Sequence, residues 1–213
     1  ILVNNAGILR DRMIFRMTEE EWDAVIKTHL YGHYYCTQPA CAIFREQRSG
    51  RIINTSSEAW LGNVSQVNYS AAKAGIVGFT RTVARDMGRY GVTCNAICPL
   101  AHTRLALRPE QLEAAKKAAE KGDTSMLEVW QVMERLMPED VSPLVVYLAT
   151  DEAANINGCV FSSHGGDIGI YPDPVLTRTI HKEGRWTVDE LIDIMPSTIA
   201  KDLVNPAPPA PPK

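Results

Sequence analysis

The stretch Asn68-Tyr-Ser-Ala-Ala-Lys-Ala-Gly75 places a tyrosine and a lysine four residues apart within a helical pattern. Four residues make about one helical turn, so the Tyr69 phenol and the Lys73 ammonium project from the same face of the helix. A free phenol titrates near pH ~10, which is too high for efficient acid–base catalysis near neutrality. A positive charge one turn away favours the phenolate, and we therefore expect Lys73 to lower the pKa of Tyr69.

Short apolar runs alternate with helical patterns on both sides of this stretch. This alternation predicts βαβ units and an α/β fold, a doubly wound parallel sheet with helices on both faces. Ligands of such sheets bind beyond the carboxyl ends of the strands, where this chain carries small and polar residues. The predicted strands are residues 1–3, 51–55, 91–97 and 158–161, and the predicted helices are 18–44 (with a bend near Pro39), 67–89, 109–137 (interrupted at 122–123) and 138–150.

Length and composition fit a single α/β domain with a sizeable core. The chain has 213 residues, of which 45% are hydrophobic and 22% charged, with a net charge of −3. No basic stripe indicates nucleic-acid binding, and no apolar run approaches the ~20 residues that a membrane helix requires. The five cysteines are odd in number and form no Cys-x-x-Cys pair, which favours buried reduced thiols over disulfides or a metal site. We therefore expect a cytoplasmic setting.

The domain is expected to span residues 1–204. A small segment around residues 186–203 closes the folded part. The proline-rich end, residues 205–213, is incompatible with a helix or a central strand and is expected to form a disordered tail.

Four motifs follow one another along the chain. They are Asn4-Asn-Ala-Gly7 after the first strand, the serines at 56 and 57 after the second, Tyr69-x-x-x-Lys73, and Asn95-Ala-Ile-Cys-Pro99 with Thr103. In this order they resemble the motifs of the short-chain dehydrogenase/reductase family, and the resemblance covers residues 1–170. Within that family, the likeness around His29 and residues 63–69 is nearest to 3-oxoacyl-acyl-carrier-protein reductases and 3-hydroxyacyl-CoA dehydrogenases.

The resemblance implies hydride transfer between NAD or NADP and a small-molecule alcohol or ketone. Tyr69 would exchange a proton with the substrate oxygen, while Lys73 would lower the tyrosine pKa and hold the nicotinamide ribose. A serine hydroxyl would position the substrate oxygen. The family also implies a homodimer or homotetramer built through helices 20–46 and 67–89. Besides Tyr69 and Lys73, the implied cofactor-binding residues are Asn4, Ala6, Gly7, Pro99 and Thr103.

Three features of this site leave alternatives open, and a fourth, at Leu100, departs from the family pattern. Spacing from the tyrosine selects Ser56 as the catalytic serine, whereas the strand pattern selects Ser57, which we favour because a strand end shifts less readily than a loop shortens. His29 stands where the family usually has asparagine, and either joins a proton relay or is a hydrogen-bonded core histidine. Thr103 either contacts the cofactor or caps the next helix. Leu100 replaces a common glycine, which puts a positive-φ turn in doubt.

The family's glycine-rich phosphate turn and its NAD-or-NADP selectivity residue would both precede Ile1. The first strand would then expose the sheet edge that normally pairs with another strand. Two functions are compatible with this pattern: part of an oxidoreductase acting on a 3-hydroxyacyl or 3-oxoacyl thioester, or a catalytically silent, cofactor-free protein that oligomerises. Residues 105–137 would form the lid that selects the substrate.

Overall fold

The computed structural model describes residues 1–103, 105 and 109–209, and these contain a five-stranded sheet in the order β1-β2-β3-β4-β5. The first four strands are parallel and β5 runs antiparallel to β4, so the predicted α/β, Rossmann-like fold is confirmed. The strands are β1 (Leu2–Asn4), β2 (Gly50–Thr55), β3 (Val92–Pro99), β4 (Val160–His164) and β5 (Asp167–Ile170).

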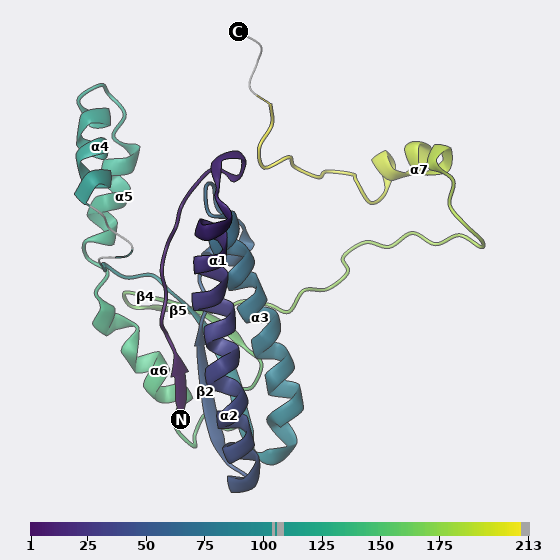
Figure 1. Ribbon diagram of the computed structural model, residues 1–213. Coiled ribbons are helices and arrows are strands. Elements are labelled where there is room, and N and C mark those ends of the chain that lie inside the picture. The colour runs from purple at the N-terminus through teal and green to yellow at the C-terminus, as the bar shows by residue number, and fades with distance from the viewer. Residues whose placement is uncertain (104, 106–108, 210–213) are drawn as a thin grey trace. The chain divides into compact units, whose positions relative to one another are not determined.

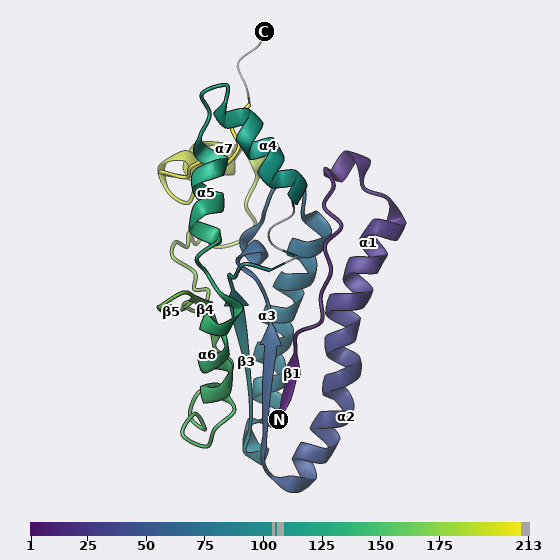
Figure 2. The same cartoon turned by 90° about the vertical axis from the view of Figure 1, so that its left-hand side faces the viewer.

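Helices cover both faces of the sheet (Figures 1 and 2). α2 (Gly32–Gln47) and α3 (Val67–Met87) lie on one face, and α6 (Ser142–Leu148) lies on the other. Neighbouring strand residues point to opposite faces, so Ile52 packs with Phe44 of α2 and Met87 of α3 while Ile53 packs with Leu148 of α6. All six residues of β2 are buried, because both of its faces are covered.

α1 (Glu19–Ile26) begins where the sequence predicts, because Thr18 and Glu21 form a reciprocal capping box. The next turn, Lys27–Tyr31, is a π-helix, and α2 continues directly from it. A bend near Pro39 was expected, and Pro39 does lie within α2. The departure from α-helical geometry, however, occurs about three turns earlier, around His29.

The charged segment after the third strand forms two helices, α4 (Pro109–Ala119) and α5 (Ser125–Met133), separated at Gly122 as predicted. In the sequence, Met126, Trp130, Met133 and Met137 fall on one helical stripe, which is typical either of core or of a lining of the substrate cleft. None of the four is buried in the structure, so they are not core: Met126 and Met137 are exposed, and Trp130 and Met133 are half-buried. Part of the predicted lid, residues 106–108, lies outside the described residues.

Gly165 and Gly166 make the turn that joins β4 to β5. The sequence did not reveal β5, because this strand is short and exposed along its whole length. Short 3-10 helices complete the described structure: Ile14–Arg16, Glu58–Leu61, Gly88–Tyr90, Pro138–Asp140 and Met195–Ser197.

β1 pairs only with β2 in the described part of the chain, so the other edge of β1 is open, with Ile1 74% and Val3 44% exposed. The chain forms two compact units, Ile1–Pro172 and a second one that begins at Asp173. The second unit contains α7 (Val188–Ile194), which begins at a capping box formed by Thr187 and Glu190. Residues 210–213 of the predicted tail lie outside the described residues.

None of the helices in the described ranges is long and apolar enough to cross a bilayer.

Candidate active site

The parallel strands bring the motif residues to one rim of the sheet. Asn4 is in register with Asn54 on β2, and Thr55 is in register with Ile97 on β3. The segments that follow these strands therefore leave the sheet side by side. Helix α3, which packs on β3 and β2, carries Tyr69 and Lys73 up to the same rim.

Lys73 is buried beneath Tyr69. Only 3% of the lysine is exposed, and its Nζ donates a hydrogen bond of 2.6 Å to the Thr55 carbonyl oxygen at the end of β2. The same Nζ lies 5.3 Å from the centroid of the Tyr69 ring. The spacing of four residues therefore brings the two side chains together as predicted.

The two serines after β2 have different partners. Ser56 is buried, and its hydroxyl donates to the Lys73 carbonyl oxygen at 3.0 Å, so it holds β2 to helix α3. The Ser57 side chain is hydrogen-bonded to Tyr69, and its oxygen also accepts from the Ala59 amide at 3.3 Å. Of the two hydroxyls, that of Ser57 is therefore the one placed beside the phenol.

Burial controls the protonation of this pair. It lowers the pKa of Lys73 to about 8, because the ammonium is shielded from water and has one carbonyl partner. Burial also raises the pKa of Tyr69, and the hydrogen bond from Ser57 opposes this rise. Our expectation that Lys73 lowers the tyrosine pKa is therefore wrong for this structure. The ammonium sits beneath the ring on Thr55, and the desolvation of the phenolate dominates.

Side-chain hydrogen bonds to α2 and β2 fix the start of the loop after β1. The Asn4 side chain is buried and donates to Thr37 Oγ1 at 3.0 Å and to Asn54 Oδ1 at 2.9 Å. Asn5 accepts a hydrogen bond of 3.0 Å from the Thr55 hydroxyl. Ala6 and Gly7 are exposed at the rim. Of the predicted loop residues, Asn4 thus supports the loop from within the core, while Ala6 and Gly7 face outward.

His29 is buried against that loop. Its Nε2 lies 2.8 Å from the Ile8 carbonyl oxygen and 3.1 Å from the Ile8 amide, so one ring tautomer donates to the carbonyl and the other accepts from the amide. A Cβ on Gly7 would come within 2.7 Å of the His29 ring, which explains the glycine. The ring also meets Tyr69 edge-on, with the two centroids 5.1 Å apart. Burial lowers the pKa of His29 to about 4.

The loop after β3 begins on the same rim. Pro99 is in register with Ser163 of β4, and the Leu100 amide donates to the Ser163 carbonyl at 3.1 Å. Leu100 is not among the positive-φ residues, so the turn forms without a glycine there. Thr103 is exposed, and α4 begins six residues later, so Thr103 does not cap that helix.

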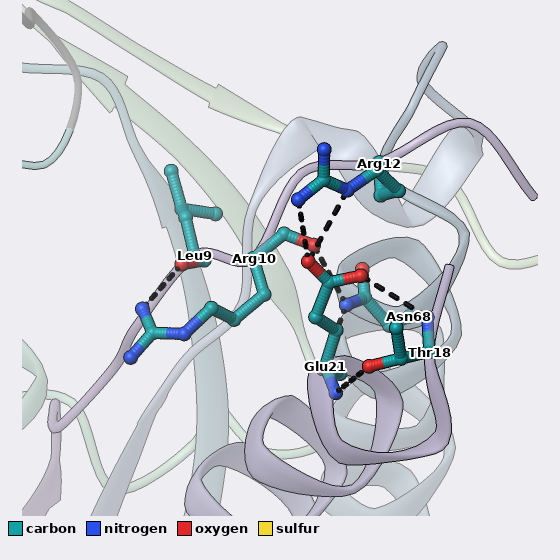
Figure 3. A network of polar contacts seen from close by, with 6 residues as sticks. All are labelled: Leu9, Arg10, Arg12, Thr18, Glu21 and Asn68. Atoms are coloured by element: carbon teal, nitrogen blue, oxygen red, sulfur yellow. Dashed lines mark hydrogen bonds and ion pairs between the residues drawn. The ribbon is translucent and has the colours of Figure 1, made fainter. Parts of the chain in front are cut away.

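Asn68 is a site residue that the sequence did not single out. Its side-chain amide donates to the carbonyls of Arg10 (3.0 Å) and Glu21 (3.1 Å), and its Oδ1 accepts from the Tyr69 amide at 2.7 Å. Figure 3 shows how this residue joins the loop after β1 to the start of α1, where Arg12 binds Glu21. An asparagine beside a catalytic motif carries no local signal of such a role, because its partners are distant in sequence.

The rim has hydrogen-bond donors that a nicotinamide cofactor requires. Of the three N–H donors of Lys73, only one has a partner among the described residues, and ribose hydroxyls are suitable acceptors for the others. The backbone of residues 6–7 is exposed beside it. The residues present thus fit the nicotinamide end of NAD or NADP. Within the described residues, no three His, Cys, Asp or Glu side chains gather as metal ligands.

Comparisons with known proteins agree with this geometry. The family model described as enoyl-(acyl carrier protein) reductase matches residues 1–167. The chain is 43% identical over 201 residues to hydroxyacyl-CoA dehydrogenase ChsB1 of Mycobacterium tuberculosis, covering 90% of this chain and 60% of that protein. It is 40% identical over 168 residues to a 3-oxoacyl-[acyl-carrier-protein] reductase of Synechocystis sp., covering 78% and 64%.

A solved short chain dehydrogenase from Mycobacterium avium superposes with a TM-score of 0.76 at 41% identity, covering 99% of this chain and 66% of that one. This chain thus spans 60% to 66% of the length of these relatives. The match over residues 1–167, the sheet order and the shared rim lead to one conclusion: the chain belongs to the short-chain dehydrogenase/reductase family.

Proposed function

We propose that this chain forms the catalytic part of an NAD(P)-dependent oxidoreductase that interconverts a 3-hydroxyacyl and a 3-oxoacyl thioester. The observation that carries the proposal is the hydrogen-bonded pair Ser57 and Tyr69 at the strand rim, above a buried Lys73. Relatives named as a hydroxyacyl-CoA dehydrogenase, a 3-oxoacyl-acyl-carrier-protein reductase and an acetoacetyl-CoA reductase support the substrate class.

In this proposal Tyr69 is the proton donor during reduction and the proton acceptor during oxidation. Ser57 hydrogen-bonds the substrate oxygen and stabilises the negative charge that develops on it. When bound, the nicotinamide supplies or accepts the hydride. Lys73 keeps a positive charge beneath the phenol below pH 8, because its pKa is about 8, and it offers its remaining N–H donors to the ribose. His29 holds the loop around Gly7 and Ile8 in place.

The substrate would enter between the rim and the segment after β3. Helix α5 exposes the apolar side chains of Met126, Val129 and Val132, which suit an acyl chain. We propose that α4 and α5 belong to the lid of the site. Thr103, at the start of this segment, is proposed as a cofactor contact together with Pro99.

We also propose that two or four copies of the chain associate through α2 and α3. Tyr34, Tyr35 and Ile43 of α2 are exposed and would be covered in such an assembly. A reducing, cytoplasmic setting is proposed from the free thiols of all five cysteines. Light scattering of the purified chain tests the assembly, and a strictly monomeric mass contradicts it.

Nicotinamide fluorescence tests the proposal directly. The 213-residue chain is titrated with NADH and with NADPH, and a fusion carrying the N-terminal part of the ChsB1 relative before Ile1 is assayed with 3-oxoacyl-CoA. We expect saturable binding and turnover by the fusion, with the preferred dinucleotide identified by the titration. A fusion that binds neither cofactor would contradict the proposal and favour the silent, oligomerising protein that the sequence also allows.

A further inference from the structure

A second buried histidine, His33, lies one helical turn after His29 and has no part in the proton transfer proposed above. Only 2% of His33 is exposed. Its Nδ1 is hydrogen-bonded to the His29 carbonyl oxygen, and an N–H at Nδ1 is the donor. Its Nε2 is buried and has no hydrogen-bond partner among the described residues.

The carbonyl that His33 contacts lies in the π-helical turn Lys27–Tyr31. A π turn interrupts the regular hydrogen-bond ladder, so its carbonyls are held less uniformly than those of an α-helix. The His29 carbonyl oxygen also accepts a backbone hydrogen bond from the Gly32 amide, three residues later. The His33 ring is therefore a side-chain restraint on the turn that carries His29.

The place of His29 matters because its ring touches two parts of the site. One edge of the His29 ring lies within 2.7 Å of the position that a Cβ on Gly7 would occupy, and its Nε2 contacts the Ile8 backbone. The same ring meets Tyr69 at 84°, with centroids 5.1 Å apart. A shift of the His29 backbone would therefore move the loop after β1 and remove a lateral contact of the Tyr69 ring.

Packing alone does not account for an imidazole at position 33. A leucine would fill a similar space without leaving a buried nitrogen unpaired, and an unpaired buried polar atom is costly. The titratable groups acting on His33 are the charged Lys73 from α3 and His29 from the preceding turn. Burial and Lys73 keep the ring neutral at pH 7, and the contact with the His29 carbonyl places its proton on Nδ1.

We propose that His33 is a positioning residue, whose Nδ1–H holds the His29 carbonyl and thereby keeps the His29 ring between Gly7 and Tyr69. Its effect on ring positions is a property of the fold, whereas its effect on turnover rests on the function proposed above. The two consequences can therefore be tested separately.

The first test is spectroscopic and uses the 213-residue chain without cofactor. Nitrogen-15 correlation spectra of the histidine rings distinguish the Nδ1–H tautomer from the Nε2–H tautomer, which is the commoner one for free neutral histidine. We expect His33 to be neutral at pH 7 with its proton on Nδ1. An Nε2–H or doubly protonated His33 would overturn the proposal, because neither state matches a neutral ring donating from Nδ1.

Two variants separate hydrogen bonding from packing. His33→Asn keeps an N–H donor near the position of Nδ1, and His33→Leu removes it. We expect the ring signals of His29 and Tyr69 to stay in place in His33→Asn and to shift in His33→Leu. Phe44→Leu, a purely apolar change in the same helix, serves as the control for lost stability. Unmoved ring signals in a folded His33→Leu chain would overturn the proposal. If His33→Leu fails to fold, displaced signals in His33→Asn overturn it instead.

The second test measures turnover in the fusion described above. We expect His33→Leu to lower kcat about 10–100-fold with the KM for the dinucleotide within about twofold, because misplaced reacting groups slow the chemical step. His33→Asn should recover at least half of kcat. Equal loss in both variants would overturn the positioning role. An inactive wild-type fusion would contradict the proposed function, while the ring spectra would still decide on His33.

Discussion

Two polar networks hold helix α3, and they differ in their access to water. Below Tyr69, Lys73 and His29 are almost fully buried and bind backbone carbonyls. At the start of the helix, Arg12 and Glu21 form an ion pair with side chains 53% and 19% exposed. The first network lies under the proposed chemistry, and the second ties down the loop beside it (Figure 3).

The difference shows what controls protonation in each place. The pKa of Lys73 is lowered because burial penalises its charge, so the lysine can lose its proton near pH 8. The pKa of Glu21 is lowered because Arg12 hydrogen-bonds its carboxylate, so the glutamate stays charged. Burial thus makes the site responsive to pH, whereas pairing makes the loop network insensitive to it near neutrality.

The largest expected effect concerns the buried network and its phenol. Tyr69→Phe in the fusion should lower turnover about 10²–10⁴-fold, because the proton donor is lost while the ring and its contact with His29 remain. Affinity for the dinucleotide should change little, as fluorescence titration can show. Tyr90→Phe, on the 3-10 turn after α3, is the matched control. Near-normal turnover of Tyr69→Phe would remove the role assigned to this residue.

Acid should weaken the buried network through its two histidines. Above pH 6.5 both rings are neutral in the folded and unfolded chain. As the pH falls towards 4, the unfolded chain binds protons that the folded chain, with both pKa values at about 4, does not. The free energy of unfolding should therefore fall by about 3 kcal/mol per histidine at pH 4.

Urea unfolding followed by circular dichroism between pH 7 and pH 4.5 measures this loss. His33→Leu should show a shallower decline than the wild type, since one of the two rings is gone. His102→Gln, at an exposed histidine, should follow the wild type. If the free energy of unfolding falls equally steeply with pH in the wild type and in His33→Leu, His33 is not buried as a neutral ring.

Alkaline pH should strengthen the same network through Lys73. Below pH 8 the amine is charged in both states, and the folded state carries the cost of burying it. Between pH 8 and 10.5 the folded chain releases a proton that the unfolded chain keeps, so stability rises with pH. Relative to Lys73→Met, the wild type should gain about 2 kcal/mol between pH 7 and 9.5. Urea unfolding measures this gain. If the free energies of unfolding of the wild type and Lys73→Met differ by the same amount at pH 7 and pH 9.5, the lowered pKa of Lys73 is contradicted.

The smallest effects are expected in the exposed network. Thr18→Ala removes the hydroxyl that accepts the Glu21 amide and should cost about 1 kcal/mol, while Thr18→Ser should cost much less. Glu21→Gln keeps an acceptor for the Thr18 amide but loses the charge paired with Arg12. Its urea midpoint should stay within the scatter of replicate titrations. A large loss of stability in Glu21→Gln would contradict this difference between the exposed and the buried network.

Sequence reasoning captured most of the fold and part of the site. The alternation of apolar runs and helical patterns predicted the four parallel strands and a helix from residue 18, where the Thr18 capping box starts α1. It missed β5 and the π turn. A short exposed strand has no hydrophobic pattern, and a π turn follows from how His29 and the loop pack together.

The sequence by itself determined which residues share the rim, because helical spacing pairs Tyr69 with Lys73 and parallel strands end on one side. Only the tertiary structure decided that Ser57 rather than Ser56 lies beside the phenol, and that burial raises the pKa of Tyr69 instead of Lys73 lowering it. The roles of His33 and Asn68 also appeared only there. The physical reason is that spacing is local, whereas desolvation and hydrogen-bond partners depend on segments far apart in the chain.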